Sequence, residues 1–177
     1  MKIKELLLES QTEQKGTYAA VQFDDDTCAA LQQYITDNEL PNGVPAKKMH
    51  CTVLYSRKPC PNFEPLGTID PPWVGTPTGL EVWESKGKLR DQPSTRCLVL
   101  KFDCDELHDR HNTLMDEHDA TYDFPEYKTH VTLSYDIGEM DETELPSITD
   151  TITSINIVNE YKDDLDLDWA STNKMKS

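Results

Sequence analysis

The sequence predicts an α+β fold in which two similar antiparallel sheets, with helices outside them, face each other across a central cleft. A strand–helix–strand pattern occurs twice, at about residues 17–85 and 96–160. His50 and His130 stand near the start of the second strand in the two copies. The 11 prolines and 7 glycines divide the chain into short segments, as a mixed α and β fold requires. At 177 residues the two copies fit one bilobal domain, residues 1–177.

The first copy begins with an apolar strand, Tyr18–Phe23, which ends at Asp24, a favoured helix N-cap. Residues of one helical face follow at i, i+4 and i+7 spacing, until Pro41–Gly43 stops the helix: Thr27, Leu31, Tyr34, Ile35 and Asn38. Period-two alternation in the next strand predicts that four side chains share a face: His50, Thr52, Leu54 and Ser56.

The second copy repeats these elements, because Phe102 follows Phe23 by 79 residues and His130 follows His50 by 80. Glu106 stands three residues after Asp103, the spacing of a capping box, so Asp103 is the expected N-cap of the second helix. The apolar side of that helix comprises Leu107, Leu114 and Met115. Alternation again predicts a common face for His130, Thr132, Ser134 and Asp136.

The remaining segments complete the predicted fold. Leu80–Trp83 and Thr151–Val158 supply one further strand per copy, and proline-rich connections are expected at 57–77 and 139–147. A short extra helix is expected within the first ten or so residues, and Ser171–Ser177 is expected to be loose.

The composition restricts the classes of partner. With a formal net charge of −16, the surface disfavours long RNA or DNA, whose binding needs many Lys and Arg contacts to phosphate. A small ligand with one or two phosphates needs only a few local donors. Five cysteines without a C-x-x-C pair predict neither a disulfide framework nor a zinc knuckle. No apolar run approaches the ~20 residues of a membrane span and no secretory signal is evident, so a soluble intracellular protein is expected.

Two H-x-T motifs carry the predicted chemistry. In each motif, His50-x-Thr52 and His130-x-Thr132, the spacing puts an imidazole and a hydroxyl on the same face of a strand. Two such strands facing a cleft present the groups that phosphodiester cleavage needs. One imidazole removes a proton from the attacking oxygen, the other protonates the leaving oxygen, and the hydroxyls bind the non-bridging oxygens. A lone histidine would indicate little, but its repetition at the same point of a repeated unit predicts a metal-independent phosphodiesterase without a cofactor.

Two other clusters suggest metal sites, and both are better explained without one. Three histidines lie within about a quarter of the circumference of the second helix: His108, His111 and His118. Their spacing is not H-x-x-x-H, so a partly buried helix face is expected there. Three aspartates alternate near the C-terminus: Asp164, Asp166 and Asp168. The glycine and distal glutamate of a calcium loop are missing, so a solvated edge is expected.

His50-Cys-Thr-Val and His130-Val-Thr-Leu resemble the paired H-x-[ST]-hydrophobic signatures of the two-histidine (2H) phosphoesterase superfamily. The whole chain more closely resembles the phage anti-CBASS nucleases, which hydrolyse cyclic di- and trinucleotide messengers of bacterial anti-phage immunity, such as 3′,3′-cyclic GMP-AMP. Four segments carry that resemblance: 15–18, 48–56, 127–134 and 160–169. It implies a bilobal (LigT-like) fold and a phosphate-handling set of His50, Thr52, His130 and Thr132.

The resemblance further implies substrate-binding roles for Tyr18, Glu160 and Trp169. Tyr18 and Trp169 would stack on nucleobases, which aromatic faces hold at about 1–3 kcal/mol each without reading base identity. Core packing for Tyr18 and simple docking for Trp169 are equally open alternatives. Lys48 and Lys128 each stand two residues before a histidine, and ordinary solvated lysines are expected at both positions.

The sequence therefore predicts a phosphodiesterase that hydrolyses 3′-5′ bonds of cyclic di- and trinucleotides, in the cytoplasm of an infected bacterial host. Its partner would be the small cyclic nucleotide, with no long nucleic acid, membrane or obligate protein partner. One alternative is a two-histidine enzyme acting on RNA ends or 2′,3′-cyclic phosphates. Another is a non-catalytic sponge that binds the messenger intact, although sequestration would not require two titrating imidazoles.

Overall fold

The computed structural model describes residues 15–85 and 94–165, which form a mixed α and β fold with one six-stranded antiparallel sheet. The strand order is β2-β1-β6-β3-β4-β5, with bounds β1 (Gly16–Phe23), β2 (Cys51–Ser56), β3 (Gly67–Ser85), β4 (Thr95–Asp103), β5 (His130–Ser134) and β6 (Ile155–Leu165). The helices are α2 (Asp25–Asp37) and α3 (Asp105–His118), with 3-10 turns η1 (Ala46–Lys48), η2 (Glu142–Glu144) and η3 (Ile148–Asp150).

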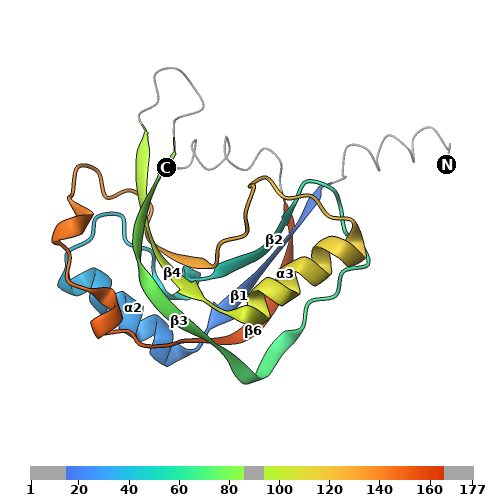
Figure 1. The fold of residues 1–177 in the computed structure, drawn as a ribbon, viewed down its shortest axis with the longest axis horizontal. Coiled ribbons are helices and arrows are strands. Elements are labelled where there is room, and N and C mark those ends of the chain that lie inside the picture. Colours follow the sequence, from blue (N-terminus) through green and yellow to red (C-terminus); the bar gives the residue numbers. More distant parts are fainter. Residues whose placement is uncertain (1–14, 86–93, 166–177) are drawn as a thin grey trace.

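The prediction of two separate sheets is not confirmed, because the long strand β3 belongs to both halves. Its first part, to Gly75, pairs with β6, and its second part, from Thr76, pairs with β4. Gly75 lies at this transition against the ring of Phe102, where a Cβ would come within 2.5 Å of the ring, so only glycine fits without a shift. Figure 1 shows β3 as a long curved strand with α2 and α3 on opposite sides of it in this view.

Each half of the sheet takes its third strand from the other sequence copy. β3 follows β2 in the chain yet pairs with β4, and β6 follows β5 yet pairs with β1. The helices are exchanged in the same way, since α3 contacts β2 and α2 contacts β5. The two edge strands, β2 and β5, also contact each other. This exchange brings the second strands of the two copies together.

The helix starts show which capping predictions hold. Asp24 caps α2 as predicted, because its side chain accepts a hydrogen bond of 2.8 Å from the backbone N–H of Thr27. The prediction for the second helix is wrong by one residue: Cys104 is the N-cap of α3, and its side chain makes no capping hydrogen bond. Asp103 instead ends β4, where it pairs with Thr76, so its backbone is committed to the sheet.

The core lies between the sheet and the two helices. From α2 it receives Leu31, Tyr34 and Ile35, and from α3 Leu107 and Leu114, as the helical periodicity predicts. His111 is also buried on α3, which confirms a partly buried face for that helix. The expected N-terminal helix and the C-terminal segment Ser171–Ser177 lie outside the described residues.

A buried ion pair joins α3 to the sheet. Arg110 donates to both carboxylate oxygens of Glu160, at 2.9 and 2.8 Å, and Glu160 also accepts from the backbone N–H of Leu66. The side chain of Glu160 is 0% exposed and that of Arg110 16%. The sheet therefore holds a charge whose compensation depends on a single guanidinium and one backbone donor.

Glu160→Gln is expected to lower the free energy of unfolding by about 3 kcal/mol, because removing one partner leaves the other charge buried and unpaired. Denaturant titration measures this loss. Glu142→Gln is the matched control, because its pair with Arg96 is about 30% exposed on each side and should lose less than about 1 kcal/mol. Equal stability of the two variants would contradict the structural role given to Glu160.

Candidate active site

The two H-x-T motifs lie on the two edge strands that contact each other. Thr52 stands opposite Ala20 on β1, and Thr132 stands opposite Val99 on β4, at matching points of the two halves. His50 immediately precedes β2 and His130 begins β5. The contact between β2 and β5 brings the two motifs to adjoining strands, and His50 contributes to the lowered pKa of His130.

Both imidazoles are oriented by the same backbone contact. Nδ1 of His50 lies 2.8 Å from the carbonyl oxygen of Lys48, and Nδ1 of His130 lies 2.9 Å from that of Lys128. A carbonyl oxygen only accepts, so Nδ1 carries the hydrogen in both rings and Nε2 remains for proton transfer. The side chains of both lysines are exposed, as predicted, while their backbones orient the histidines.

A β-bulge follows each motif. Thr52 and Leu54 pair with the consecutive residues Ala20 and Ala19, so Val53 is the extra residue in β2. Leu133 is the extra residue in β5 in the same way. The prediction that Leu54 and Ser134 continue the histidine face is therefore wrong, because a bulge reverses the alternation.

Tyr18 lies beside the first motif. Its hydroxyl is 3.0 Å from Oγ1 of Thr52, and its ring centroid is 6.3 Å from that of His50 in an edge-on arrangement. Burial raises the pKa of Tyr18, so its hydroxyl stays protonated. In the second half Cys97 occupies the corresponding place, where burial raises the pKa of its thiol and Thr132 opposes that shift.

Trp83 flanks the second motif and was missed as a site residue in the sequence. Its ring centroid lies 4.2 Å from that of His130, and its indole N–H donates to Glu81, 2.9 Å away. Glu81 in turn pairs with Lys101 at 3.3 Å. The sequence placed Trp83 in a strand but in the wrong half, because the exchange of β3 depends on long-range pairing.

Glu160 and Trp169 are the other two predicted substrate-binding residues. Glu160 pairs with Val21, on the sheet face opposite to His50 and Thr52, and its carboxylate is engaged by Arg110. The carboxylate of Glu160 is thus paired within the fold, and its substrate-binding role stays a prediction. Trp169 lies outside the described residues.

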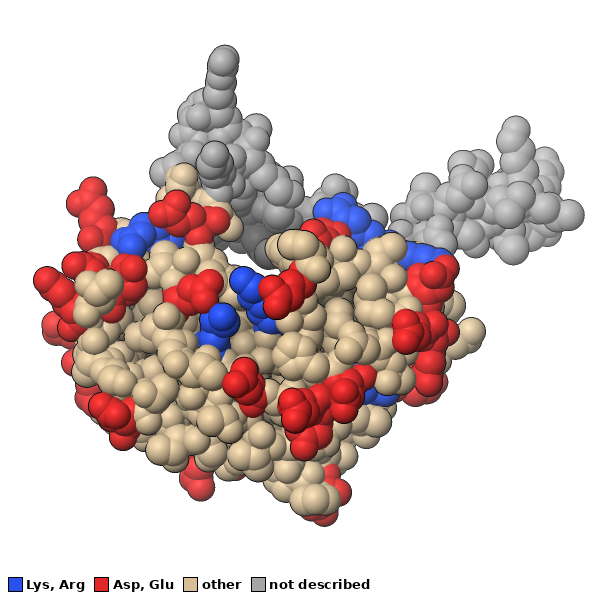
Figure 2. Space-filling model, in the orientation of Figure 1, with Lys and Arg blue, Asp and Glu red and all other residues tan. Residues whose placement is uncertain are grey.

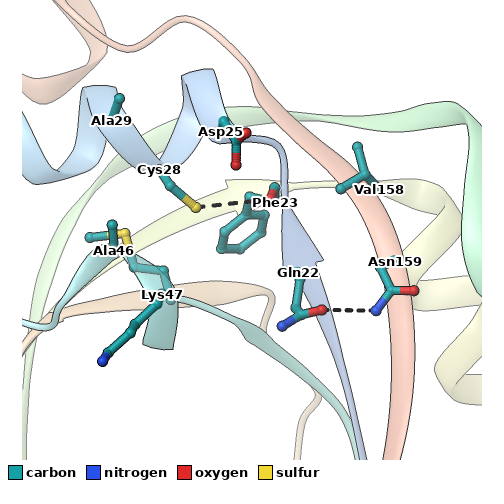
Figure 3. Close-up of a pocket in the computed structure, with 10 residues that line it drawn as sticks. Gln22, Phe23, Asp25, Cys28, Ala29, Ala46, Lys47, Val158 and Asn159 are labelled. Atoms are coloured by element: carbon teal, nitrogen blue, oxygen red, sulfur yellow. Dashed lines mark hydrogen bonds between the residues drawn. The ribbon is translucent and has the colours of Figure 1, made fainter.

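A cavity of about 560 Å³ lies next to the first motif, between the start of α2, the end of β1 and β6 (Figure 3). Gln22 and Asn159 share a 2.8 Å amide hydrogen bond in its lining, and Met49, directly before His50, also contributes. None of the four H-x-T side chains lines this cavity. The cavity is therefore separate from the H-x-T side chains.

The surface charge is predominantly acidic on the face shown in Figure 2. Figure 2 shows acidic side chains over much of the visible face, with several Lys and Arg side chains gathered near its centre. The net charge of −16 repels a polynucleotide, whereas a local group of cations is enough for one or two phosphates.

Comparison with known proteins identifies the family. The family model described as "Anti-CBASS protein Acb1" matches residues 15–172. The chain belongs to the Acb1 family. A relative from Acinetobacter phage Ac42, named anti-CBASS protein Acb1, is 43% identical over 88% of this chain and 94% of its own. Acb1 of Enterobacteria phage T4 is 34% identical over 88% and 91%, and that of Salmonella phage S16 is 31% identical over 93% and 97%.

Among solved structures, the protein TT0787 of Thermus thermophilus is similar, with a TM-score of 0.48 and 13% identity over 82% of each chain. This likeness is too distant to bear on the fold or the function of the Acb1 family.

The helix histidines considered as a metal cluster in the sequence contact aromatic side chains in this Acb1 family member. Over residues 15–85 and 94–165, no group of three His, Cys, Asp or Glu side chains could hold a metal ion. His111 is buried against Tyr127, and His118 contacts the edge of Phe63. Of the three alternating aspartates only Asp164 is described, and it is exposed. In the same part of the chain, no helix is long and apolar enough to cross a membrane.

Proposed function

We propose that this protein is a metal-independent two-histidine phosphodiesterase that hydrolyses 3′-5′ bonds of cyclic di- and trinucleotides, such as 3′,3′-cyclic GMP-AMP, to linear products. The observation that carries the proposal is the matched pair of imidazoles on adjoining edge strands, each held by a carbonyl at Nδ1 with Nε2 left for proton transfer. Membership of a family named for anti-CBASS action supports a cyclic nucleotide ligand and action inside the infected bacterial cell.

The four motif side chains divide the reaction between them. One imidazole takes the proton of the attacking oxygen and the other gives a proton to the departing oxygen. The hydroxyls of Thr52 and Thr132 donate to the non-bridging phosphate oxygens, where negative charge increases in the transition state. Tyr18 and Trp83, one beside each histidine, offer ring faces on which bases can stack.

Incubation with a panel of cyclic di- and trinucleotides, followed by mass analysis, tests the proposal. Linear product supports the phosphodiesterase. If the free ligand is depleted but is recovered intact after the protein is denatured, the protein is instead a non-catalytic sponge. No interaction with any panel member, combined with cleavage of a 2′,3′-cyclic mononucleotide, would move the substrate class to RNA ends.

Turnover is expected to be unchanged in excess EDTA, because the two imidazoles supply both proton transfers. The measurement is the initial rate before and after EDTA treatment and dialysis. Loss of activity with EDTA, restored by zinc or manganese, would show that metal chemistry takes part.

The pH profile is expected to reflect the burial of His130. Burial lowers the pKa of His130 below its ordinary value of 6.5, His50 lowers it further, and the Lys128 carbonyl and Glu81 oppose the shift. His130 is thus neutral at pH 7, the state of a general base, so kcat/KM should fall only as the pH drops through a value below 6.5.

Glu81→Gln sharpens this test. Removing the carboxylate charge should move the acid limb of kcat/KM to lower pH, because Glu81 raises the pKa of His130. Glu84→Gln, an exposed neighbour on β3, is the matched control and should leave the limb in place. An acid limb above pH 6.5, or one that Glu81→Gln leaves in place, would argue against His130 as the base.

A further inference from the structure

Two carbonyl groups at the bulge in the edge strand β2 accept hydrogen bonds from side chains. The hydroxyl of Tyr127 donates to the carbonyl oxygen of Thr52 at 2.7 Å. Nδ1 of His111 lies 2.7 Å from the carbonyl oxygen of Val53 and must donate to it, since a carbonyl only accepts. Buried carbonyls need such partners, so these contacts hold the bulge in its observed shape.

The two donors form one buried unit. The rings of Tyr127 and His111 stack with centroids 4.1 Å apart and planes 6° apart. Tyr127 is 9% exposed and His111 5%. Burial raises the pKa of Tyr127 and lowers that of His111, so both remain neutral donors.

The corresponding bulge in β5 is held differently. There the backbone N–H of Val44 donates to the carbonyl oxygen of Leu133 at 2.9 Å, so a backbone group takes the place of a side-chain donor. Tyr127 stands three residues before His130, so its contact with Thr52 also ties the segment that leads into β5 to strand β2.

A buried thiol lies near the same contact. Burial raises the pKa of the Cys51 thiol, which lies between His50 and Thr52, and the nearby backbone of His130 and hydroxyl of Tyr127 oppose that shift. The hydrogen bond from the Tyr127 hydroxyl to Thr52 therefore fixes the relative position of the two motifs, with Cys51 packed near it on the side of β2 opposite to the imidazole.

We propose that Tyr127 and His111 are positioning residues of the active site: by holding the Thr52 and Val53 carbonyls they set the place of Thr52 and its distance from His130. This inference rests on the proposed phosphodiesterase function. Neither residue reaches the substrate, because both lie in the core. Their effect passes through Thr52, whose hydroxyl must match the phosphate in the transition state.

Tyr127→Phe tests the proposal, because it removes the hydroxyl and keeps the ring on His111. On a cyclic dinucleotide, kcat is expected to fall about tenfold with KM changed less than about twofold, in an enzyme whose circular dichroism is unaltered. Tyr122→Phe is the matched control: its ring also contacts His111, and its hydroxyl makes no hydrogen bond to any described residue. Its kcat should stay within about twofold of the wild type.

A double mutant separates positioning from general loss of stability. In a Thr52→Val background, Tyr127→Phe should lower kcat less than about twofold, because the hydroxyl that it positions is already gone. A further loss of about tenfold in that background, or an unchanged kcat for Tyr127→Phe alone, would overturn the inference.

His111 provides a second, independent variant pair. Gln retains a donor for the Val53 carbonyl and Leu does not, so His111→Gln should keep a higher kcat than His111→Leu. Equal losses for the pair would count against the role of the hydrogen bond. Failure of the wild type to cut any cyclic nucleotide would instead refute the proposed function, which separates the two outcomes.

Discussion

Replacing either His50 or His130 by alanine is expected to lower turnover of a cyclic dinucleotide by at least about 100-fold, as loss of a general acid or base does. The double replacement should be little worse than either single one, because residues that act as a unit are not additive. Steady-state kinetics on the purified variants provides the measurement.

His118→Ala is the control for this pair. It lies in the last turn of α3 against Phe63, outside the site, and should keep near-wild-type turnover. Near-wild-type turnover of His50→Ala would disprove a mechanism that uses two imidazoles. If the fold-losses in turnover of the two single variants multiply in the double variant, the histidines act in separate steps.

A cyclic dinucleotide built only from 2′-deoxyribose is expected to bind but to be cut at least about 1,000-fold more slowly. In the path that we favour, the ribose 2′-hydroxyl attacks the neighbouring phosphorus, and the 5′-oxygen leaves with a proton from the second histidine. The tethered hydroxyl is already within reach, which avoids the entropic cost of bringing in a water. The first product carries a 2′,3′-cyclic phosphate, which water then opens.

Chromatography coupled to mass analysis over time checks this mechanism with the natural substrate. A linear species should accumulate transiently that has the mass of the cyclic substrate, one water less than the final product, and a retention time different from that of the substrate. Calorimetry with the deoxy compound confirms that binding persists when cleavage does not. Rapid and complete cleavage of the deoxy compound would instead indicate direct attack by a histidine-activated water.

Local patterns in the sequence predicted the parts of the fold that depend on neighbouring residues. Asp24 caps α2, and Leu31 and Ile35 face the core, because capping and periodicity act within a few residues. Both H-x-T motifs lie at the start of strands for the same reason. The repeat of these signals indicated that the two motifs belong to equivalent units.

The features of the fold that the sequence did not predict depend on pairing between strands that are distant in the chain. The assignment of Trp83 to the half that holds His130 follows from the exchange of β3, which no local pattern reports. The bulges at Val53 and Leu133 depend on register with the neighbouring strand. The resemblance implied a substrate-binding role for Glu160, and no local pattern reports its contact with Arg110, 50 residues away in the chain.

The exchange of β3 and β6 has a consequence for how such a chain could be assembled from its repeat. A chain with one copy of the repeat would lack the strand beside β1 and expose a sheet edge ready for pairing. Two such chains could each insert that strand into the sheet of the other, as domain-swapped dimers do. When the two copies are fused, the strand exchange occurs within one chain, so folding no longer depends on protein concentration. The interlocked halves thus have the geometry of a swapped homodimer joined into one chain.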